Sequence, residues 1–592
     1  MAFQLSPGVN VTEKDLTTIV PAVATTNAAF AGVFTWGPVD KRILIDSENN
    51  LAKLFGLPNN YNFQYWFSAS NFLQYGNNLQ VVRCLPEVTT AKNAAPFTTA
   101  SGPQAILIKN DDFFTNAGAT TNGPFMARYP GSLGNSLDVE ICGSAAVGFS
   151  TWAYADEFDA IAATSDYAGS LGGIADEFHL VVVDSNGLWT GASGTVLERF
   201  SNLSLAEDAQ DFSGIASYYR TKVNDSSRYI FCPAGGTASS LQFGTAAGSI
   251  STAFNFKGAT ANDNVSFGVA KYVFTRGAGG TGADSAMGAA DFMNLAFGGT
   301  GNGYRAFQDP EITDVNLIIA GPDHQPSTGT ATDPVARVLK DIADTRKDCV
   351  VFASCPISNP IMAEDTKLAL AKSYRNLIGS SSYVFIDSGY KYMYDIYNDK
   401  YRWVPLNGDI AGLCARTDAN TDPWFSPAGF NRGNIKGVVK LAFNPTQTFR
   451  DELYKNNINP VCTFPGEGTI LYGDKTAQAK PSAFDRINVR RLFIVLEKAI
   501  ATASKYSLFE FNDSFTRAQF RSLVEPFLRD VQARRGVIDF KVVCDEKNNT
   551  PEVIDSNRFV ADIYIKPARS INFIQLNFIA TRTGVSFSEV GA

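Results

Sequence analysis

The side chains best suited to metal binding or to nucleophilic catalysis are few and scattered. Only two histidines occur, His179 and His324. His179 lies in the strand-like run DEFHLVVVD, which favours a structural role, and His324 follows the strand-like run NLIIAGP, where it could lie at the mouth of a loop. Neither has a second histidine or a cysteine nearby at the spacing of a metal site. The pattern therefore does not favour a metalloenzyme or a histidine-dependent hydrolase.

The cysteines indicate packing and not redox chemistry. None of the eight forms a CxxC pair, and two of them, Cys349 and Cys355, flank the apolar run VVFAS. Dispersed cysteines in a cytoplasmic chain usually behave as small apolar residues. We therefore predict buried, reduced thiols, and we expect no catalytic residue, no cofactor and no metal ligand.

Two glycine-rich stretches could bind phosphate groups. Gly277, Gly279 and Gly282 match GxGxxG after a short strand, but a dinucleotide site also needs an acidic residue about 20 positions on. That position falls in GGTGNGYRAF, and the next acid is Asp309, so we predict a surface loop. The second stretch, GEGTILYGDKT (466–476), carries a carboxylate just before its Lys-Thr pair, where it would repel a phosphate. An enzyme that binds a nucleotide at 277–282 remains the less favoured alternative.

Composition excludes several classes of protein. The chain has 592 residues with a net charge of -8, of which 45% are apolar and only 18% charged, against a typical charged share of about 25%. Its 44 Phe and 22 Tyr exclude intrinsic disorder. No run approaches the ~18 apolar residues of a membrane span, and the first residues lack the pattern of a signal peptide. We expect a soluble protein of several domains that is made in a cytoplasm and is not inserted in a membrane.

The elements that position these residues begin with an α/β region in the middle of the chain. Apolar runs predict strands at 314–322 and 349–356, separated by a helix over 333–348 with Asp333 as N-cap and Pro334 at its first position. This β-α-β succession favours a parallel sheet. The same reasoning predicts a further helix over 363–378 and a strand at 382–388.

Residues 91–310 differ from this region in composition. They are rich in Ala, Gly, Thr, Ser and Asn, and they contain short strand-like runs at 137–141 and 178–183. We interpret them as an inserted, mainly-β domain with peripheral helices, which faces outward.

The C-terminal part, from about residue 481, reads as a compact α+β unit. One helix is predicted over 487–505, and a second opens with a capping box from Thr516 to Gln519, contains Pro526 and stops at Gly536. Three strands follow, at 537–545, 559–567 and 570–581.

Charge is divided unevenly between this unit and the rest. Residues 480–592 carry 17 basic and 13 acidic groups, while the remainder of the chain has a net charge of -12. A solvated helix surface and a surface for an acidic partner both explain this surplus. Nucleic acid is not favoured as the partner, because basic clusters interleaved with aromatic residues are missing. The candidate residues in the two helices are Arg490, Arg491, Arg517, Arg521, Arg529, Arg534 and Arg535.

Near both chain ends lie short segments in which apolar and polar residues alternate. Val9 and Val11 alternate with polar residues near the start, and Val585 and Phe587 do so near the end. Such segments can add a strand to a sheet edge, either within the same chain or in a neighbouring molecule.

Several strings, taken together and in order, indicate a family. Near the start they are LSPGV (5–9), GVFTWGP (32–38), FGLP (55–58) and NFLQYGNNLQVVR (71–83). After residue 387 they include YKYMYDIYNDKYRWVPLNGDIAGLCARTD, SPAGFNRG, ILYGDKTA, FDRINVRRLF, VVCDEKNNTPEVID and KPARSINFIQLNF. In these strings the chain resembles the tail sheath proteins of contractile-tailed bacteriophages of the myovirus type. It departs from the larger family members in lacking most of a β-barrel insertion expected soon after residue 93.

The resemblance implies a multidomain α/β and α+β fold. It implies an N-terminal arm over 1–22, a discontinuous α/β core over 23–92 and 311–479, and an inserted mainly-β outer domain over 93–310. The C-terminal α+β domain over 480–592 would face the tail tube and end in an arm over 582–592. Val9, Val11, Val585 and Phe587 are then arm residues that pair with neighbouring subunits, and the seven arginines are candidates for the tube-facing surface.

The function implied is mechanical. Subunits would polymerise as stacked hexameric rings around the tail tube, in contact also with the baseplate and with terminator and neck proteins, after assembly in the host cytoplasm. Contraction of this lattice would drive the tube through the host envelope for genome delivery. The alternative within the same class is the sheath of a phage-derived contractile injection system.

Overall fold

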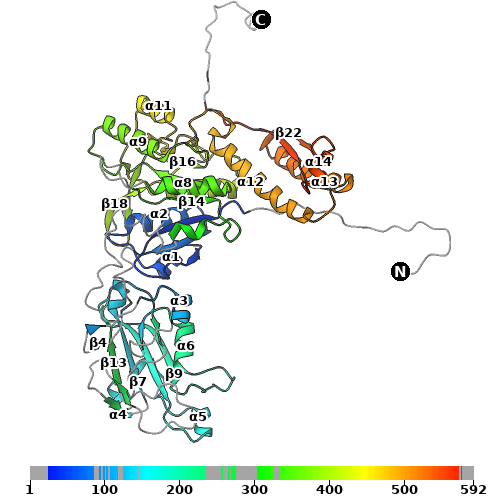
Figure 1. Cartoon of the computed structure of the whole chain (residues 1–592). Coiled ribbons are helices and arrows are strands. Elements are labelled where there is room, and N and C mark those ends of the chain that lie inside the picture. Colours follow the sequence, from blue (N-terminus) through cyan, green and yellow to red (C-terminus); the bar gives the residue numbers. More distant parts are fainter. Residues whose placement is uncertain are drawn as a thin grey trace, which may run out of the picture. The chain divides into compact units, whose positions relative to one another are not determined.

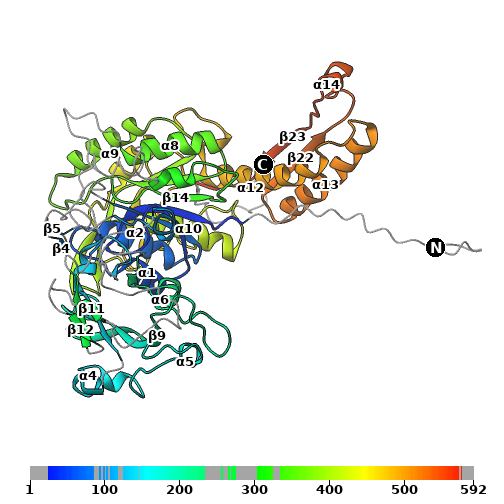
Figure 2. The ribbon, with the colours of Figure 1, turned by 60° about the horizontal axis from the view of Figure 1, so that its bottom comes forward.

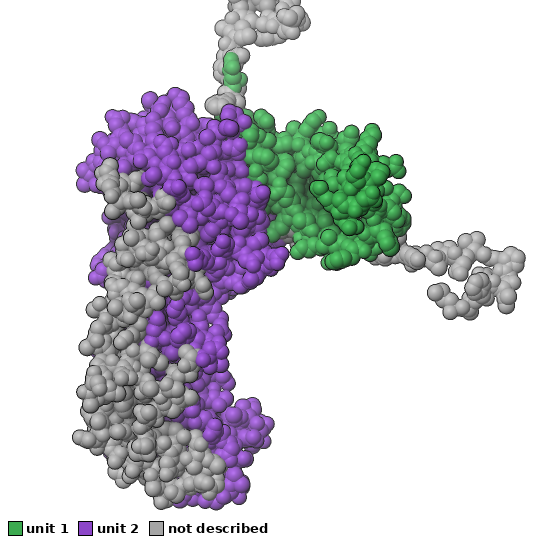
Figure 3. Space-filling model, viewed as in Figure 1, with its two compact units in different colours: residues 1–23, 421–426, 482–592 green, residues 24–420, 427–481 purple. Residues whose placement is uncertain are grey.

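The described part of the chain forms two compact units. The computed structural model describes residues 24–85, 93–94, 98–99, 102–103, 107–117, 125–143, 146–233, 255–257, 264–266, 269–274, 303–323, 334–572 and 575. The smaller unit, green in Figure 3, contains residues 421–426 and the described residues from 482 onward. The larger unit, purple, contains the described residues from 24 to 420 and from 427 to 481. Residues 421–426 fall inside the range that we predicted for the core.

A six-stranded sheet organises the larger unit (Figure 1), in the order β16-β15-β14-β1-β3-β2. Its strands are β1 (Ala28–Val33), β2 (Arg42–Ile45), β3 (Leu79–Cys84), β14 (Leu317–Ile319), β15 (Val350–Ser354) and β16 (Val384–Asp387). All neighbours run parallel except β2, which is antiparallel to β3. The predicted parallel β-α-β succession is therefore confirmed. Because β1 pairs with both β3 and β14, segments from before and after the insertion interleave in one sheet.

Helices cover both faces of this sheet, which is why its strands are continuous apolar runs. Figure 2 shows α8 and α9 on one side of β14, and α2 and α10 on the other. The helices of this region are α1 (Glu48–Phe55), α2 (Phe63–Leu73), η4 (Gly303–Phe307), α8 (Val335–Arg346), α9 (Glu364–Ile378), α10 (Asn407–Asn420) and α11 (Gln447–Lys455).

Helix α8 begins one residue later than predicted and is capped by a different aspartate. Pro334 is the N-cap residue with extended backbone and not the first helical residue. The carboxylate of Asp323 accepts hydrogen bonds from the N–H groups of Val335 and Ala336, each at 3.2 Å. The predicted cap, Asp333, lies outside the described residues. A carboxylate at a helix N-terminus is favoured by the helix dipole, and here it comes from the segment after β14.

Two glycines let α10 approach the α2 segment closely. A Cβ atom on Gly408 would lie 2.1 Å from the carbonyl oxygen of Ser68, and one on Gly412 would lie 2.6 Å from the ring of Tyr75. Only glycine fits at such distances, so this pair fixes how the two helices pack.

Two hairpin-based sheets complete the core. One contains β17 (Tyr390–Asp395), β18 (Lys400–Pro405) and β19 (Lys440–Leu441), and the other contains β20 (Val461–Phe464) and β21 (Gly468–Leu471). The second glycine-rich stretch forms the β20–β21 turn, where Gly466 and Gly468 have φ values of 82° and 85°. These two glycines therefore serve a tight turn, whereas a Cβ on Gly473 would lie 2.8 Å from the Oδ1 of Asn459, so this third glycine serves a close approach. Neither role is that of a phosphate loop.

The insertion is built on an antiparallel sheet in the order β13-β7-β8-β9. Its strands β7 (Leu137–Cys142) and β8 (Glu177–Asp184) confirm the two predicted runs, and they lie between β13 (Val269–Val273) and β9 (Thr195–Ser204). The short strand pairs are β6 (Met126–Ala127) with β10 (Ile230–Phe231), β4 (Thr98–Thr99) with β5 (Gly102–Pro103), and β11 (Asn255–Lys257) with β12 (Asn264–Ser266). The helices are α3 (Asp111–Ala117), η1 (Ser132–Ser136), α4 (Ala146–Thr151), η2 (Ala155–Glu157), α5 (Asp166–Ser170) and α6 (Tyr219–Ser226).

His179 has the structural role that its position predicts. It is buried on β8, where its Nε2 lies 2.8 Å from the carbonyl oxygen of Ala160 and its Nδ1 accepts a hydrogen bond from the N–H of Asn202. Burial lowers the pKa of this imidazole, so the neutral form is favoured.

The C-terminal unit packs two long helices against a two-stranded sheet. Its elements are η5 (Ala483–Asp485), α12 (Ile487–Ser504), η6 (Lys505–Ser507), α13 (Ser514–Ala533), β22 (Val537–Val543), α14 (Pro551–Asp555) and β23 (Asp562–Pro567). Leu492 and Leu496 of α12 meet Phe520, Val524 and Leu528 of α13 in one apolar cluster. Two of the three predicted strands are present; of the third, residues 570–572 are not a strand and most of the rest lies outside the described residues.

Both ends of α13 differ from the prediction. The helix begins at Ser514 and not at a Thr516 capping box, because the Asp513 carboxylate accepts a hydrogen bond from the N–H of Thr516 at 2.8 Å. At the other end the left-handed residue is Arg535 (φ 68°) and not Gly536. Gly536 is needed for a close approach instead, since a Cβ there would lie 2.7 Å from Val531.

Candidate assembly surfaces

The seven candidate arginines do not form one exposed surface. Arg490 and Arg491 on α12 and Arg517 on α13 are buried, so they are not available as an exposed basic face. The guanidinium of Arg490 lies 3.9 Å from the ring centroid of Phe484, and that of Arg517 donates to the side chain of Asn512. Arg521 is half-buried and donates to the carbonyl oxygen of Cys544 at 2.8 Å. These four residues therefore have contacts within the chain.

The remaining three arginines are exposed. Arg529 lies on α13. Arg534 and Arg535 follow the last helical residue, so the prediction that they lie in the helix is wrong. Arg534 pairs with Asp422 at 3.1 Å and with Asp530 at 3.3 Å, and Arg529 lies 3.8 Å from Glu525. Exposed pairs of this kind are worth about 0–1 kcal/mol, so these guanidinium groups can exchange partners at little cost.

The two-stranded sheet of the C-terminal unit has open edges. β22 and β23 pair only with each other among the described residues. Ile563 and Ile565 of β23 pack toward the helices, while Tyr564 between them is exposed. An isolated two-stranded sheet is marginally stable, and further strands stabilise it.

A buried ion pair lies beside the central sheet. The ammonium group of Lys391 on β17 donates to the carboxylate of Asp409 on α10 at 2.9 Å, and both side chains are 0% exposed. The same carboxylate oxygen accepts from the hydroxyl of Tyr75 at 3.1 Å. Burial raises the pKa of Asp409, and the neighbouring Lys391 opposes this shift. With no exposed atom, the pair can orient the packing of α10 on the sheet but cannot contact a substrate.

A second buried carboxyl group, that of Asp387, ends β16. It accepts hydrogen bonds from the hydroxyl of Ser354 at 2.8 Å and from the N–H of Gly389 at 2.9 Å. Burial raises its pKa to about 8. Because the strand ends are enclosed by α10, this site is again structural. The sequence analysis missed both carboxylates; the signal for the ion pair was a lysine inside the apolar strand YKYMY.

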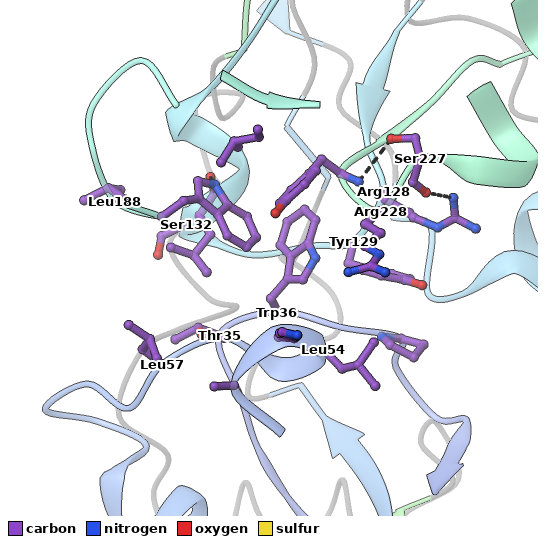
Figure 4. Close-up of a pocket in the computed structure, with 18 of the residues that line it drawn as sticks. Thr35, Trp36, Leu54, Leu57, Arg128, Tyr129, Ser132, Leu188, Ser227 and Arg228 are labelled. Atoms are coloured by element: carbon purple, nitrogen blue, oxygen red, sulfur yellow. Dashed lines mark hydrogen bonds between the residues drawn. The ribbon is translucent and has the colours of Figure 1, made fainter. Parts of the chain in front are cut away.

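A hollow with a volume of about 1060 Å³ lies where the insertion meets the core (Figure 4). The ring of Trp36, in the core, packs edge to face against the rings of Trp189 and Tyr129. The distances between ring centroids are 4.9 Å and 5.5 Å. Beside them Arg128 donates to the carbonyl oxygen of Ser227. The described residues that line the hollow include no histidine or cysteine.

Arg83 reinforces the same junction. Fully buried on β3, it donates to the carbonyl oxygens of Phe34 at 2.9 Å, Gly37 at 2.8 Å and Pro130 at 2.7 Å. One guanidinium group thus ties the core to the segment of the insertion between β6 and η1. The signal in the sequence was a charged residue inside the apolar run LQVVRCL, whose role the sequence alone did not reveal.

Several predicted residues lie outside the described part of the chain. These are Val9, Val11, Val585, Phe587, Gly277, Gly279, Gly282 and His324. Among the described residues there is no group of three or more His, Cys, Asp or Glu side chains arranged to hold a metal ion. Where the structure is described, no helix combines the length and the apolar character needed to cross a bilayer.

Three family models match successive parts of the chain. The N-terminal region of domain III of the Gp18 tail sheath protein matches residues 25–84, the phage tail sheath central domain matches 278–477, and the phage tail sheath C-terminal domain matches 479–581. The tail sheath protein of Vibrio phage KVP40 is 35% identical over 679 aligned positions, which cover 99% of each chain. The chain belongs to the phage tail sheath protein family.

Two further tail sheath proteins support this assignment. That of Enterobacteria phage T4 is 35% identical with 99% of each chain covered, and that of Salmonella phage ViI is 32% identical over 100% of this chain and 98% of its own. The family predicted from the sequence is therefore confirmed, as is the function of a structural subunit of a contractile phage tail, which makes the protein a virion component. The alignments are longer than the 592 residues of this sheath chain, so they include insertions that it lacks.

Proposed function

We propose that this sheath subunit assembles through its C-terminal unit into stacked hexameric rings around the tail tube. In this proposal the 1–22 and 582–592 arms add strands to the open edges of the β22–β23 sheet in neighbouring subunits. The observation that carries the proposal is the 35% identity to tail sheath proteins over 99% of the chain. The outer edges of β22 and β23, which pair with no other strand among the described residues, support the use of this sheet.

The tube-facing surface is proposed to involve Arg529, Arg534 and Arg535. They are the exposed members of the predicted set, and they lie in the part of the chain with a surplus of basic residues. Contacts made by solvated charges suit a partner along which the sheath must slide, because such contacts are weak and easily screened. Arg490, Arg491 and Arg517 are left out because they are buried.

The proposed mechanism is a rigid-body rearrangement in which no bond is made or broken. The extended sheath, held by the tube and the baseplate after assembly in the host cytoplasm, would pass to a shorter and wider lattice of lower free energy and drive the tube through the envelope. The protein would act without catalytic residues or cofactors. Baseplate, terminator and neck proteins would bind the ends of the lattice.

The first test is negative-stain electron microscopy of the purified full-length protein without tube protein. Ribbed hollow tubes are the expected result, since the contracted lattice is proposed to be the intrinsic minimum. Deletion of residues 582–592 should abolish them, and monomers from both proteins at all concentrations would contradict the proposal. For the tube contact, Arg529→Glu with Arg535→Glu should reduce assembly on purified tubes but not self-assembly. The matched control is Arg199→Glu, an exposed arginine of the insertion.

A further inference from the structure

Helices α12 and α13 of the C-terminal unit are labelled in Figure 1. The segment from the end of α12 to the start of α13 carries an unusual set of exposed apolar side chains. Within ten residues, five large apolar side chains face solvent. They are Tyr506 (78% exposed), Leu508 (62%), Phe509 (105%), Phe511 (85%) and Phe515 (73%), and we call them the aromatic ridge. Single exposed apolar residues are ordinary, but a contiguous set of this kind marks an interaction surface.

The backbone that carries the aromatic ridge is held in place. The N–H of Leu508 donates to the carbonyl oxygen of Lys505, and the side chain of Asn512 donates to the carbonyl oxygen of Arg558 at 2.9 Å. Asp513 then caps α13. Phe509 has a φ of 70°, a conformation that bulky residues rarely adopt. The rings are therefore presented by a fixed turn, which lowers the entropy cost of docking.

The area of the ridge matches one side of a specific interface. An aromatic side chain buries roughly 150–250 Å². The five exposed fractions together correspond to about four fully exposed side chains, or about 800 Å². Stable interfaces bury about 800 Å² on each partner. The ridge alone thus supplies most of one side of a stable contact.

The structure assigns the aromatic ridge to a contact with a second copy of this chain. This inference rests on the proposed function, in which the subunit meets both its own copies and the tube. The tube contact must be released during contraction, whereas contacts between copies persist, and buried aromatic anchors make contacts that dissociate slowly. In the segment 505–515, which carries the ridge, only Lys505, Glu510 and Asp513 are charged, so this surface differs from the exposed arginines proposed to face the tube.

The test replaces two ridge residues in the full-length protein. Phe509→Asn with Phe511→Ser removes two rings, and asparagine tolerates the left-handed backbone at 509. The matched control is Phe212→Asn with Ile215→Ser, which removes two exposed apolar side chains, 102% and 65% exposed, from the insertion. By sedimentation velocity and electron microscopy, the ridge variant should need at least a tenfold higher concentration to assemble, whereas the control should stay within twofold of the parent protein. Thermal unfolding midpoints of both variants should match that of the parent protein.

The other occupants give different results. If the parent protein and the ridge variant assemble equally well, the ridge contact is wrong but the proposed function stands. If the parent protein never assembles, the proposed function is refuted. A ridge variant that self-assembles but no longer binds purified tubes would assign the ridge to the tube. Phe511→p-benzoylphenylalanine in a mixture of ¹⁴N- and ¹⁵N-labelled protein should give mixed-isotope cross-links. Cross-links confined to one chain, reaching its own terminal arms, would overturn the inference.

Discussion

The buried Lys391–Asp409 pair allows a sharp test of how the core is held together. Lys391→Met keeps the length of the side chain but leaves the Asp409 carboxylate without its cation. At 2.9 Å and an effective dielectric constant near 20, the lost attraction is about 6 kcal/mol, which normally offsets the desolvation of both charges. Removal of one partner of a buried pair costs about 3–5 kcal/mol. We expect a loss of about 4 kcal/mol in the free energy of unfolding of the core.

The double variant separates the pair from simple loss of packing. Asp409→Asn removes the charge and keeps an acceptor for the hydroxyl of Tyr75. Lys391→Met with Asp409→Asn should therefore recover at least half of the loss, because no unpaired charge remains. The measurement is urea unfolding with hydrogen-exchange labelling, read on peptides from β17 and α10. A double variant as unstable as Lys391→Met would refute the assignment of the cost to the unpaired carboxylate.

The pH dependence gives an independent check. Burial raises the pKa of Asp409, and loss of Lys391 removes the group that opposes this shift. If the pKa of a carboxyl group is higher in the folded state than its unfolded value of about 3.9, the group is protonated in both states below that value. There its ionisation does not lower the free energy of unfolding. The difference in the free energy of unfolding between Lys391→Met and the parent protein should therefore become smaller as the pH falls from 7 toward 4. A difference that is constant over this range would contradict the explanation.

Three further predictions follow from local geometry. Gly408→Ala should destabilise the core by about 1–3 kcal/mol or more in urea unfolding, because its Cβ would lie 2.1 Å from the Ser68 carbonyl oxygen, whereas Gly169→Ala, with ordinary 3.8 Å contact, should be neutral. Asp513→Ala should cost the C-terminal unit about 1 kcal/mol through loss of the α13 cap, and an equal loss in the exposed control Glu510→Ala would contradict this. Asp387 has a pKa raised to about 8, so its contribution to stability is present below pH 4 and is lost as the pH rises through 8; Asp387→Asn should flatten the stability profile between these values, and an unchanged slope would reject this role.

The spacing of apolar residues in the sequence predicted those helices and strands whose formation depends on neighbouring residues in the chain. The apolar runs at 349–356 and 382–388 became β15 and β16, and the helical spacing from 487 onward became α12. The cysteines, all eight of which are described, are buried and form no disulfide, as expected. The family followed from strings of residues and not from any single motif.

The errors share one physical cause, which is contact between residues far apart in the chain. The cap of α8 comes from Asp323 across a stretch that no local pattern spans, and the burial of Arg490 and Arg517 depends on how two helices and a sheet pack. Charge counted along a sequence does not distinguish a guanidinium that lies on Phe484 from one in solvent. The buried carboxylates of Asp387 and Asp409 were missed for the same reason.

The interleaved central sheet has a consequence for synthesis on the ribosome. Ala29 of β1 pairs with Ile318 of β14, about 290 residues later in the chain. At bacterial elongation rates of about 5–20 residues per second, β1 waits roughly 15 to 60 s before β14 emerges. During that time one edge of β1, a fully buried apolar strand in the folded protein, is open to pairing with nascent chains on neighbouring ribosomes. The antiparallel sheet of the insertion, whose strands β7 and β8 lie close together in sequence, emerges within this interval, so it can fold before the central sheet is completed.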